Sequence, residues 1–186
     1  MRSSSKYITD SDIQQFIRNE LWNGTIKAAL QRNKTYKEDT QNSEKLTFKN
    51  SIRSKLEEIE KKYHERTVDE DEHIENLLRL QNCSKDFKDI LINGQLNIGT
   101  CQKFLNIYLK GLWCSGILKN IPPQAPLDAI IKDRLNIEMG NWTQMENIEE
   151  YTSAMDQLRS ISERNDLRIA ELELLVYNGK IENLDL

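Results

Sequence analysis

All three prolines of this 186-residue chain, Pro122, Pro123 and Pro126, fall in one short stretch. A proline interrupts a helix or a central strand, because its ring fixes φ and removes one backbone donor. The chain has only seven glycines, and strand-like alternation of apolar and polar residues is nowhere sustained. This distribution predicts an all-α fold, with roughly eight helices packed irregularly in a single domain over residues 1–186.

Apolar residues that recur every three or four positions mark the predicted helices. Ser11 is expected to cap a first helix that ends at the Trp-Asn-Gly sequence of residues 22–24. A long helix with charged flanks is predicted over Glu44–Glu65. Residues Thr143 to Glu146 have the pattern of a capping box and predict the start of a later helix.

The composition excludes two classes of protein. Hydrophobic residues make up 38% of the chain and charged residues 30%, a balance that neither a disordered chain nor a membrane protein has. No apolar run reaches the roughly 18 residues of a membrane span. We therefore expect a cytoplasmic protein with no membrane partner, and a monomer.

The positions of the cysteines and histidines give little support to a metal site or to a serine–histidine catalytic triad. The three cysteines form no CxxC pair, and buried thiols are their simplest interpretation. His64 and His73 lie in heavily charged helical sequence, and for His73, within Asp69–Glu75, a solvated acidic face is favoured over a metal site. No metal is expected.

The charge of the chain is unevenly distributed. The formal net charge of −4 argues mildly against a nucleic-acid partner. Between Leu96 and Arg134, however, five lysines and arginines stand against two aspartates, which leaves a local charge of +3. The segment Gln95–Arg134 is therefore the best candidate for contact with DNA.

This segment begins with a predicted tight turn. Asn97 and Gly99 are residue types that tolerate a left-handed backbone, so residues 96–100 can form a hairpin turn. Backbone amides at such a turn, directly before a helix, bind phosphate. We therefore predict that Asn97, Gly99 and Thr100 contact the DNA backbone.

The order of motifs in this segment resembles the helix-hairpin-helix DNA glycosylases, and most closely their 8-oxoguanine branch, which includes the archaeal enzymes. In that family a hairpin grips the DNA backbone, a lysine just after it is the nucleophile, and an aspartate opens a later helix after a proline-rich approach. Here Ile98–Thr100 matches the hairpin, Lys103 the lysine, and Asp128, in Pro-Leu-Asp, the aspartate. The resemblance implies a helix-hairpin-helix and catalytic segment over residues 84–135.

The same resemblance implies a DNA glycosylase with lyase activity that acts on double-stranded DNA, with no cofactor except a possible monovalent ion at the hairpin. Cleavage of an N-glycosidic bond builds positive charge on the sugar, which the Asp128 carboxylate would stabilise. A lysine made neutral by burial and by a neighbouring cation can attack the sugar carbon and form a Schiff base that leads to strand cleavage. Lys103 would be this nucleophile, with Lys110 and Lys132 as possible neighbours.

Base excision also requires a pocket for the extruded base, with flat walls and polar groups that read its edge. Aromatic residues are the candidates for the walls of this pocket, and glutamines are the candidates for the groups that bond to the base edge. The candidate walls are Trp22, Tyr108, Trp113 and Trp142, and the candidate readers are Gln102 and Gln124.

Ordinary structural roles compete with each of these assignments. Lys103 can be an exposed solubilising residue, and Asp128 a helix-start charge favoured by the macrodipole. Tyr108 and Trp113 can be core residues, and Trp142 can be a hydrophobic staple.

Two other functions stay open at this point. One is a non-catalytic helical module that binds nucleic acid or a protein through the same turn. The other is an acidic partner protein that uses segment Glu65–Glu75. A common pocket for Lys103 and Asp128 favours the enzyme, whereas separate solvent-exposed positions favour the module.

Overall fold

The computed structural model describes residues 8–182 and 184–186, and every regular element in these ranges is a helix. The only β-type pairing there is an isolated antiparallel bridge between Tyr36 and Leu91. The all-α prediction is therefore confirmed, although the first seven residues of the predicted domain lie outside the described part. In the same ranges, no helix combines the length and the apolar character that a membrane span needs. The elements are α1 (Asp10–Leu30), α2 (Asn42–Glu65), α3 (Glu70–Ser84), the 3₁₀ helix η1 (Lys85–Phe87), α4 (Ile98–Cys114), α5 (Ala129–Leu135), the 3₁₀ helix η2 (Trp142–Gln144), α6 (Ile148–Arg164) and α7 (Ile169–Tyr177).

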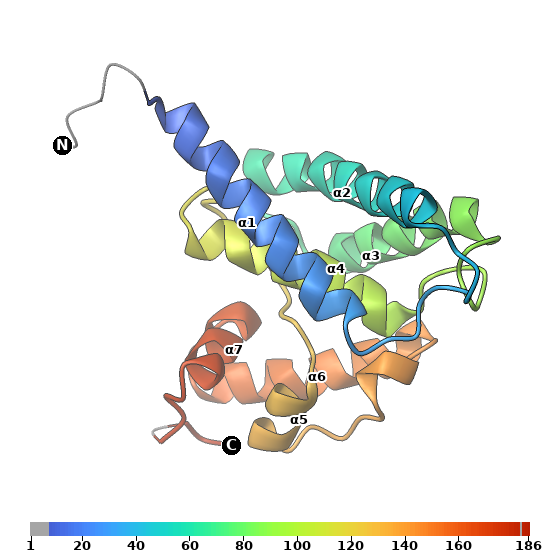
Figure 1. The fold of residues 1–186 in the computed structure, drawn as a ribbon. Helices are drawn as coiled ribbons and strands as arrows, with labels where there is room; N and C mark the ends of the chain where they lie inside the picture. Colours follow the sequence, from blue (N-terminus) through green and yellow to red (C-terminus); the bar gives the residue numbers. More distant parts are fainter. Residues whose placement is uncertain (1–7, 183) are drawn as a thin grey trace.

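Helix α4 lies in the middle of the molecule (Figure 1). It packs against α1, α2 and α3 on one side and against α6 and η2 on the other, while α5 and α7 pack against each other. Almost every residue in its first half is buried, including the polar Gln102, Lys103 and Asn106. Buried polar side chains need partners, so these three residues mark the part of the fold where a site can form.

The predicted break in the first helix is wrong. Helix α1 continues through Gly24 to Leu30, supported by its packing against α4. Its cap is Thr9 rather than Ser11: Thr9 Oγ1 accepts from the Asp12 amide, and Asp12 Oδ2 accepts from the Thr9 amide. This capping box starts the helix one turn before its first apolar positions.

Helix α2 confirms the predicted long helix, but the capping box predicted at Thr143 to Glu146 is wrong. Residues 142–144 form η2, and α6 starts only after Asn147, whose side chain accepts from the Glu150 amide at 3.0 Å. The backbone at Met145 is extended because its carbonyl accepts a hydrogen bond from the first turn of α4. A tertiary contact has therefore overridden the local pattern.

Gly99, in the first turn of α4, is required by the close approach of another segment. A Cβ atom at this position would lie 1.7 Å from the Trp142 carbonyl oxygen. Gly99 has a helical backbone, and Asn97, the N-cap of α4, has φ −77°. The left-handed turn predicted at these two residues is therefore wrong. The left-handed residue of this connection is Gly94, with φ +69°.

Gly99→Ala is therefore expected to lower the free energy of unfolding by about 1–3 kcal/mol, as overpacking of a tight contact does. Denaturant unfolding followed by circular dichroism measures the change. Gly24→Ala is the matched control, because it lies within a helix with nothing within 4 Å of its Cβ position. That variant should gain about 0.5–1 kcal/mol. Equal gains in both variants would contradict the close approach at Gly99.

Candidate active site

Lys103 and Asp128, the two residues predicted to carry the chemistry, meet in the structure. Lys103 lies in the second turn of α4, and Asp128 is the N-cap of α5, where its Oδ1 accepts from the Ile131 amide at 3.0 Å. The Lys103 Nζ donates to Asp128 Oδ2 at 2.9 Å. Lys103 is only 5% exposed, so the two charges interact in a poorly hydrated environment.

Burial and charge shift the pKa values of both groups. Burial lowers the pKa of Lys103 below its usual range, against the attraction of Asp128, which raises it. Burial raises the pKa of Asp128, but the Lys103 ammonium and the backbone amides of α5 outweigh burial and hold that pKa below its usual range. The carboxylate is therefore charged at neutral pH, and the lysine loses its proton more easily than a lysine in water.

Gln102 fixes the loop that carries Asp128. Its Nε2 donates to the Leu127 carbonyl at 2.9 Å, and its Oε1 accepts from the Leu127 amide at 3.0 Å. The side chain is 0% exposed, and both ends of its amide are used. The predicted base-reading role is therefore wrong for Gln102. Its two hydrogen bonds to Leu127 instead hold the segment that carries Asp128 against the helix that carries Lys103.

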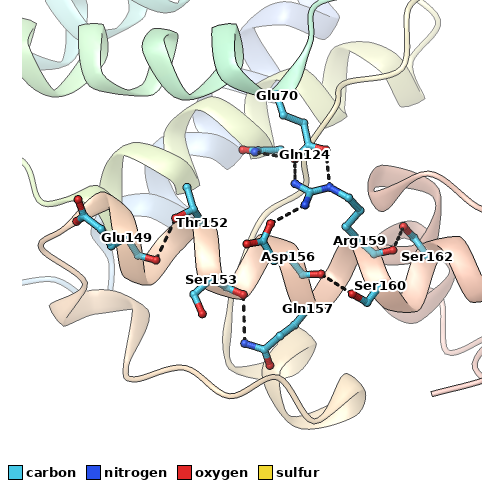
Figure 2. Close-up of polar contacts among 10 residues, drawn as sticks. All are labelled: Glu70, Gln124, Glu149, Thr152, Ser153, Asp156, Gln157, Arg159, Ser160 and Ser162. Carbon is cyan, nitrogen blue, oxygen red and sulfur yellow. Dashed lines mark hydrogen bonds and ion pairs between the residues drawn. The ribbon is translucent and has the colours of Figure 1, made fainter.

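Gln124 makes its hydrogen bonds to residues other than Lys103 and Asp128. Its Oε1 accepts from the Tyr151 hydroxyl at 2.6 Å, and its Nε2 donates to Glu70 at 3.3 Å. Figure 2 shows Gln124 beside the ion pair between Glu70 and Arg159, which joins α3 to α6. The prediction that Gln124 reads a base is therefore wrong, and its contacts anchor the proline loop between these two helices.

His73 is fully buried, so the solvated acidic face predicted around it is wrong at this position. Its Nδ1 lies 2.9 Å from the Tyr63 hydroxyl, and its Nε2 lies 2.8 Å from Asn106 Oδ1. The Asn106 amide in turn donates to the Ala125 carbonyl at 2.9 Å, within the proline loop. Burial lowers the pKa of His73 to about 4. The period of α3 places His73 beside the buried Leu77, although its sequence neighbours are acidic.

This buried ring predicts a loss of stability in acid. Between about pH 6.5 and pH 4 the unfolded chain binds a proton at His73 that the folded protein does not bind. The contribution of neutral His73 to the free energy of unfolding is fully present above the pKa of the unfolded chain. It falls by about 3 kcal/mol as the pH drops to the pKa of the folded protein.

The measurement compares the parent with His73→Gln at pH 7 and pH 4. The difference between their free energies of unfolding should change by about that amount, since the carboxylates contribute equally to both proteins. A parent-to-variant difference that is the same at both pH values would contradict a buried neutral ring.

A cavity of about 520 Å³ opens beside the Lys103–Asp128 pair. Its volume is that of a small-molecule site. Thr25 is among the lining residues, and its buried hydroxyl has no hydrogen-bond partner in the described part of the chain. A more open depression of about 630 Å³ between α2 and α3 contains neither residue of the pair. The cavity is lined from α1 by Glu20, Leu21, Gly24, Thr25 and Ala28, from α4 by Lys103, Ile107, Lys110, Gly111 and Cys114, from the loop by Pro126 and Asp128, and from α7 by Glu173, Leu174, Tyr177 and Asn178.

Three of the four aromatic residues predicted as walls belong to the core. Trp22 stacks on Phe104 with ring centroids 6.1 Å apart. The Tyr108 hydroxyl donates to Glu60 of α2 at 2.7 Å, and Trp113 is half-buried against the core. Aromatic residues at helical spacing pack inward more often than they line a site, and the predicted wall role is wrong for these three.

Two other aromatic rings lie near the lysines of the cavity. The Trp142 ring centroid is 5.2 Å from Lys103 Nζ. Tyr177 of α7 is 65% exposed, lines the cavity and has Lys110 Nζ 4.2 Å from its ring centroid. Tyr177 therefore offers an accessible flat wall, which no predicted residue supplied.

The far end of the cavity carries a second buried ion pair. Lys110 Nζ contacts both carboxylate oxygens of Glu173, at 2.8 and 2.6 Å. Burial raises the pKa of Glu173 above its usual range, although Lys110 opposes the shift. Glu173 and Tyr177 are four residues apart, which places both on one face of α7. This spacing was the only signal for them in the sequence.

Two backbone amides at the start of α4 already have partners within the protein. The Gly99 amide donates to the Met145 carbonyl at 3.1 Å, and the Thr100 amide donates to Asn97 Oδ1 at 2.8 Å. The Thr100 hydroxyl accepts from Asn33. The predicted phosphate contact is therefore wrong for the amides of Gly99 and Thr100, because the protein itself uses these groups. For Asn97 it stays a prediction. The monovalent ion at the hairpin stays a prediction.

Neither metal ligation nor similarity to known proteins assigns a role to the cavity. Within residues 8–182 and 184–186, no group of three or more His, Cys, Asp or Glu side chains could hold a metal ion. Comparison of the chain with protein-family models, with curated proteins and with solved structures finds no match. The geometry of the cavity is therefore the basis for a functional hypothesis.

Proposed function

We propose that this chain is a DNA glycosylase with lyase activity, which excises a modified base from double-stranded DNA. The observation that carries the proposal is the 2.9 Å contact between Lys103 Nζ and Asp128 Oδ2 in the wall of a 520 Å³ cavity. A buried lysine of lowered pKa beside a carboxylate is the pairing that imine-forming cleavage of a glycosidic bond requires.

Lys103 is the proposed nucleophile. Its unprotonated Nζ forms a bond to C1′ of the target nucleotide as the C1′–N bond breaks, and the base leaves with the bonding electron pair. The C1′–O4′ bond then opens to give an imine between Nζ and C1′. Loss of a C2′ proton from this imine expels the 3′ phosphate and nicks the strand. Water hydrolyses the remaining imine and restores the lysine.

Asp128 is the proposed electrostatic group. Positive charge develops on the sugar as the base leaves, and a carboxylate fixed beside it lowers the energy of that transition state. The Ile131 amide and the Gln102–Leu127 contacts hold Asp128 in place before the substrate binds. Preorganisation of this kind avoids a reorganisation cost during the reaction.

The remaining walls of the cavity suit an extruded base. Tyr177 presents an accessible ring for stacking. Glu173 supplies acceptors and Lys110 supplies donors at the far end. Aromatic stacking combined with a few polar contacts is how enzymes recognise a base that has left the helix.

A panel of duplexes, each with one modified base, tests the activity. Each duplex is incubated with the protein and assayed for abasic sites, by alkaline cleavage, and for nicks without alkali. The proposal predicts both products on at least one duplex, and nicks on a duplex with a preformed abasic site. If the protein binds the duplexes but leaves all of them intact, including the abasic one, the non-catalytic binding module becomes the better account.

A further inference from the structure

Two grooves lie on the surface beside the catalytic pair. The first, which we call the α5 groove, has a volume of about 390 Å³ and is lined by Arg32, Ala129, Lys132, Asp133 and residues 139–143. The second, the turn groove, has a volume of about 270 Å³ and is lined by residues 32–35, by parts of segment 92–97, and by the start of α4. Both are lined by Arg32 and Thr143, so the two grooves are neighbours, and we call them together the groove path.

Lys103 lies between this path and the cavity. It lines the cavity directly, and its Nζ is 5.2 Å from the ring of Trp142, which lines the α5 groove. Ala129, the residue after Asp128, also lines the α5 groove. A ligand that reaches from the groove into the cavity would therefore pass the Lys103 amino group.

The grooves and the cavity differ in charge. In the cavity, both lysines are paired with carboxylates, and Glu20 adds a further negative charge. The grooves contain Arg32, Lys34 and Lys132 against the single acid Asp133. In the part of the chain that the structure describes, none of these three cations forms an ion pair. The cavity therefore suits an uncharged base, and the grooves suit an anion.

The three cations stand out because the chain as a whole is acidic, with a net charge of −4. Two other kinds of donor nearby are already occupied: Arg134 donates to the Val176 carbonyl, and the amides of Gly99 and Thr100 have partners within the protein. Phosphate contacts supply most of the affinity of DNA-binding proteins, and the unpaired cations of the grooves are the side chains best placed to make them.

We propose that the α5 groove and the turn groove hold the phosphates that flank the extruded nucleotide, with Arg32 and Lys132 as the principal cations. This inference rests on the proposed DNA glycosylase function. It assigns the path of the DNA backbone to the end of α1 and the face of α5, and the base to the cavity on the other side of Lys103. Contacts of this kind position the duplex without reading its sequence.

The test is a titration of the full-length protein with a fluorescent duplex that carries one stable abasic analogue, at several salt concentrations. The Arg32→Ala/Lys132→Ala double variant should bind at least about tenfold more weakly at low salt. Its plot of log affinity against log salt should be less steep by about 2, because two phosphate contacts are lost. Thermal unfolding of the double variant should match the parent, since both side chains line open grooves.

Lys61→Ala/Arg79→Ala is the matched control, with the same change in net charge on the exposed faces of α2 and α3. It should bind within about twofold of the parent, with an unchanged salt slope. Equal weakening in both double variants, or parent-like binding of the Arg32/Lys132 variant, would overturn the inference. Borohydride trapping of the parent through Lys103 separates the two proposals: trapping without a groove effect removes only the groove assignment, whereas absence of trapping removes the glycosylase function.

Discussion

Lys103→Ala is expected to abolish cleavage of DNA at an abasic site, because no imine can form without the Nζ amine. A preformed abasic site is the appropriate substrate, since it tests the lysine independently of which base the cavity accepts. Single-turnover nicking at excess protein measures the loss, which should bring the rate to that of DNA without protein.

Lys119→Ala is the control for this experiment, because Lys119 is an exposed lysine in the same segment and its removal changes the net charge equally. It should cleave like the parent. The folded state of Lys103→Ala should survive, since Asp128 is 29% exposed at its side chain and still caps α5. Residual nicking by a folded Lys103→Ala protein would place the nucleophile elsewhere.

Asp128→Asn is expected to reduce base excision at least about a hundredfold, which corresponds to roughly 2.7 kcal/mol of lost transition-state stabilisation. Asparagine caps a helix as well as aspartate does, so the contact to Ile131 and the start of α5 should persist. DNA affinity should also stay close to that of the parent, because Asp128 lines the cavity and not the α5 groove.

The same variant distinguishes two roles of the carboxylate. Asp128 raises the pKa of Lys103, so its neutralisation should lower that pKa further and shift the acid limb of the rate profile to lower pH. If Asp128 acted only by holding the lysine protonated, the variant would react faster than the parent at neutral pH. Stabilisation of the transition state by Asp128 instead predicts slower excision at every pH, and an unchanged or increased rate would contradict that role.

Local patterns in the sequence were sufficient for much of the fold. The apolar stripe of α2 repeats at helical spacing, which is the strongest signal that a single sequence carries. In α4 all residues from 98 to 106 are buried, because other helices pack against it on several sides. The proline stretch marked the connection between α4 and α5 correctly, because proline acts on its own backbone. Gly24 misled the prediction, since an exposed glycine within a helix is tolerated when neighbouring helices support it.

For the site, too, local features could be predicted from the sequence and tertiary contacts could not. Asp128 could be predicted because an aspartate at a helix start is a local feature, and the order of motifs placed Lys103 before it. The roles of Gln102 and Gly99 depend on Leu127 and Trp142, which are distant in the sequence. Partners of this kind are set by tertiary packing, and no spacing rule relates them.

The most direct test of the central claim is identification of the residue that becomes covalently attached to DNA. The parent protein is incubated with a duplex that contains one abasic site, the imine is reduced with borohydride, and the digested adduct is mapped by mass spectrometry. The proposed mechanism predicts one principal adduct on Lys103, absent in Lys103→Ala. An adduct on another lysine, adducts spread over the surface lysines, or no adduct from folded parent protein would contradict it.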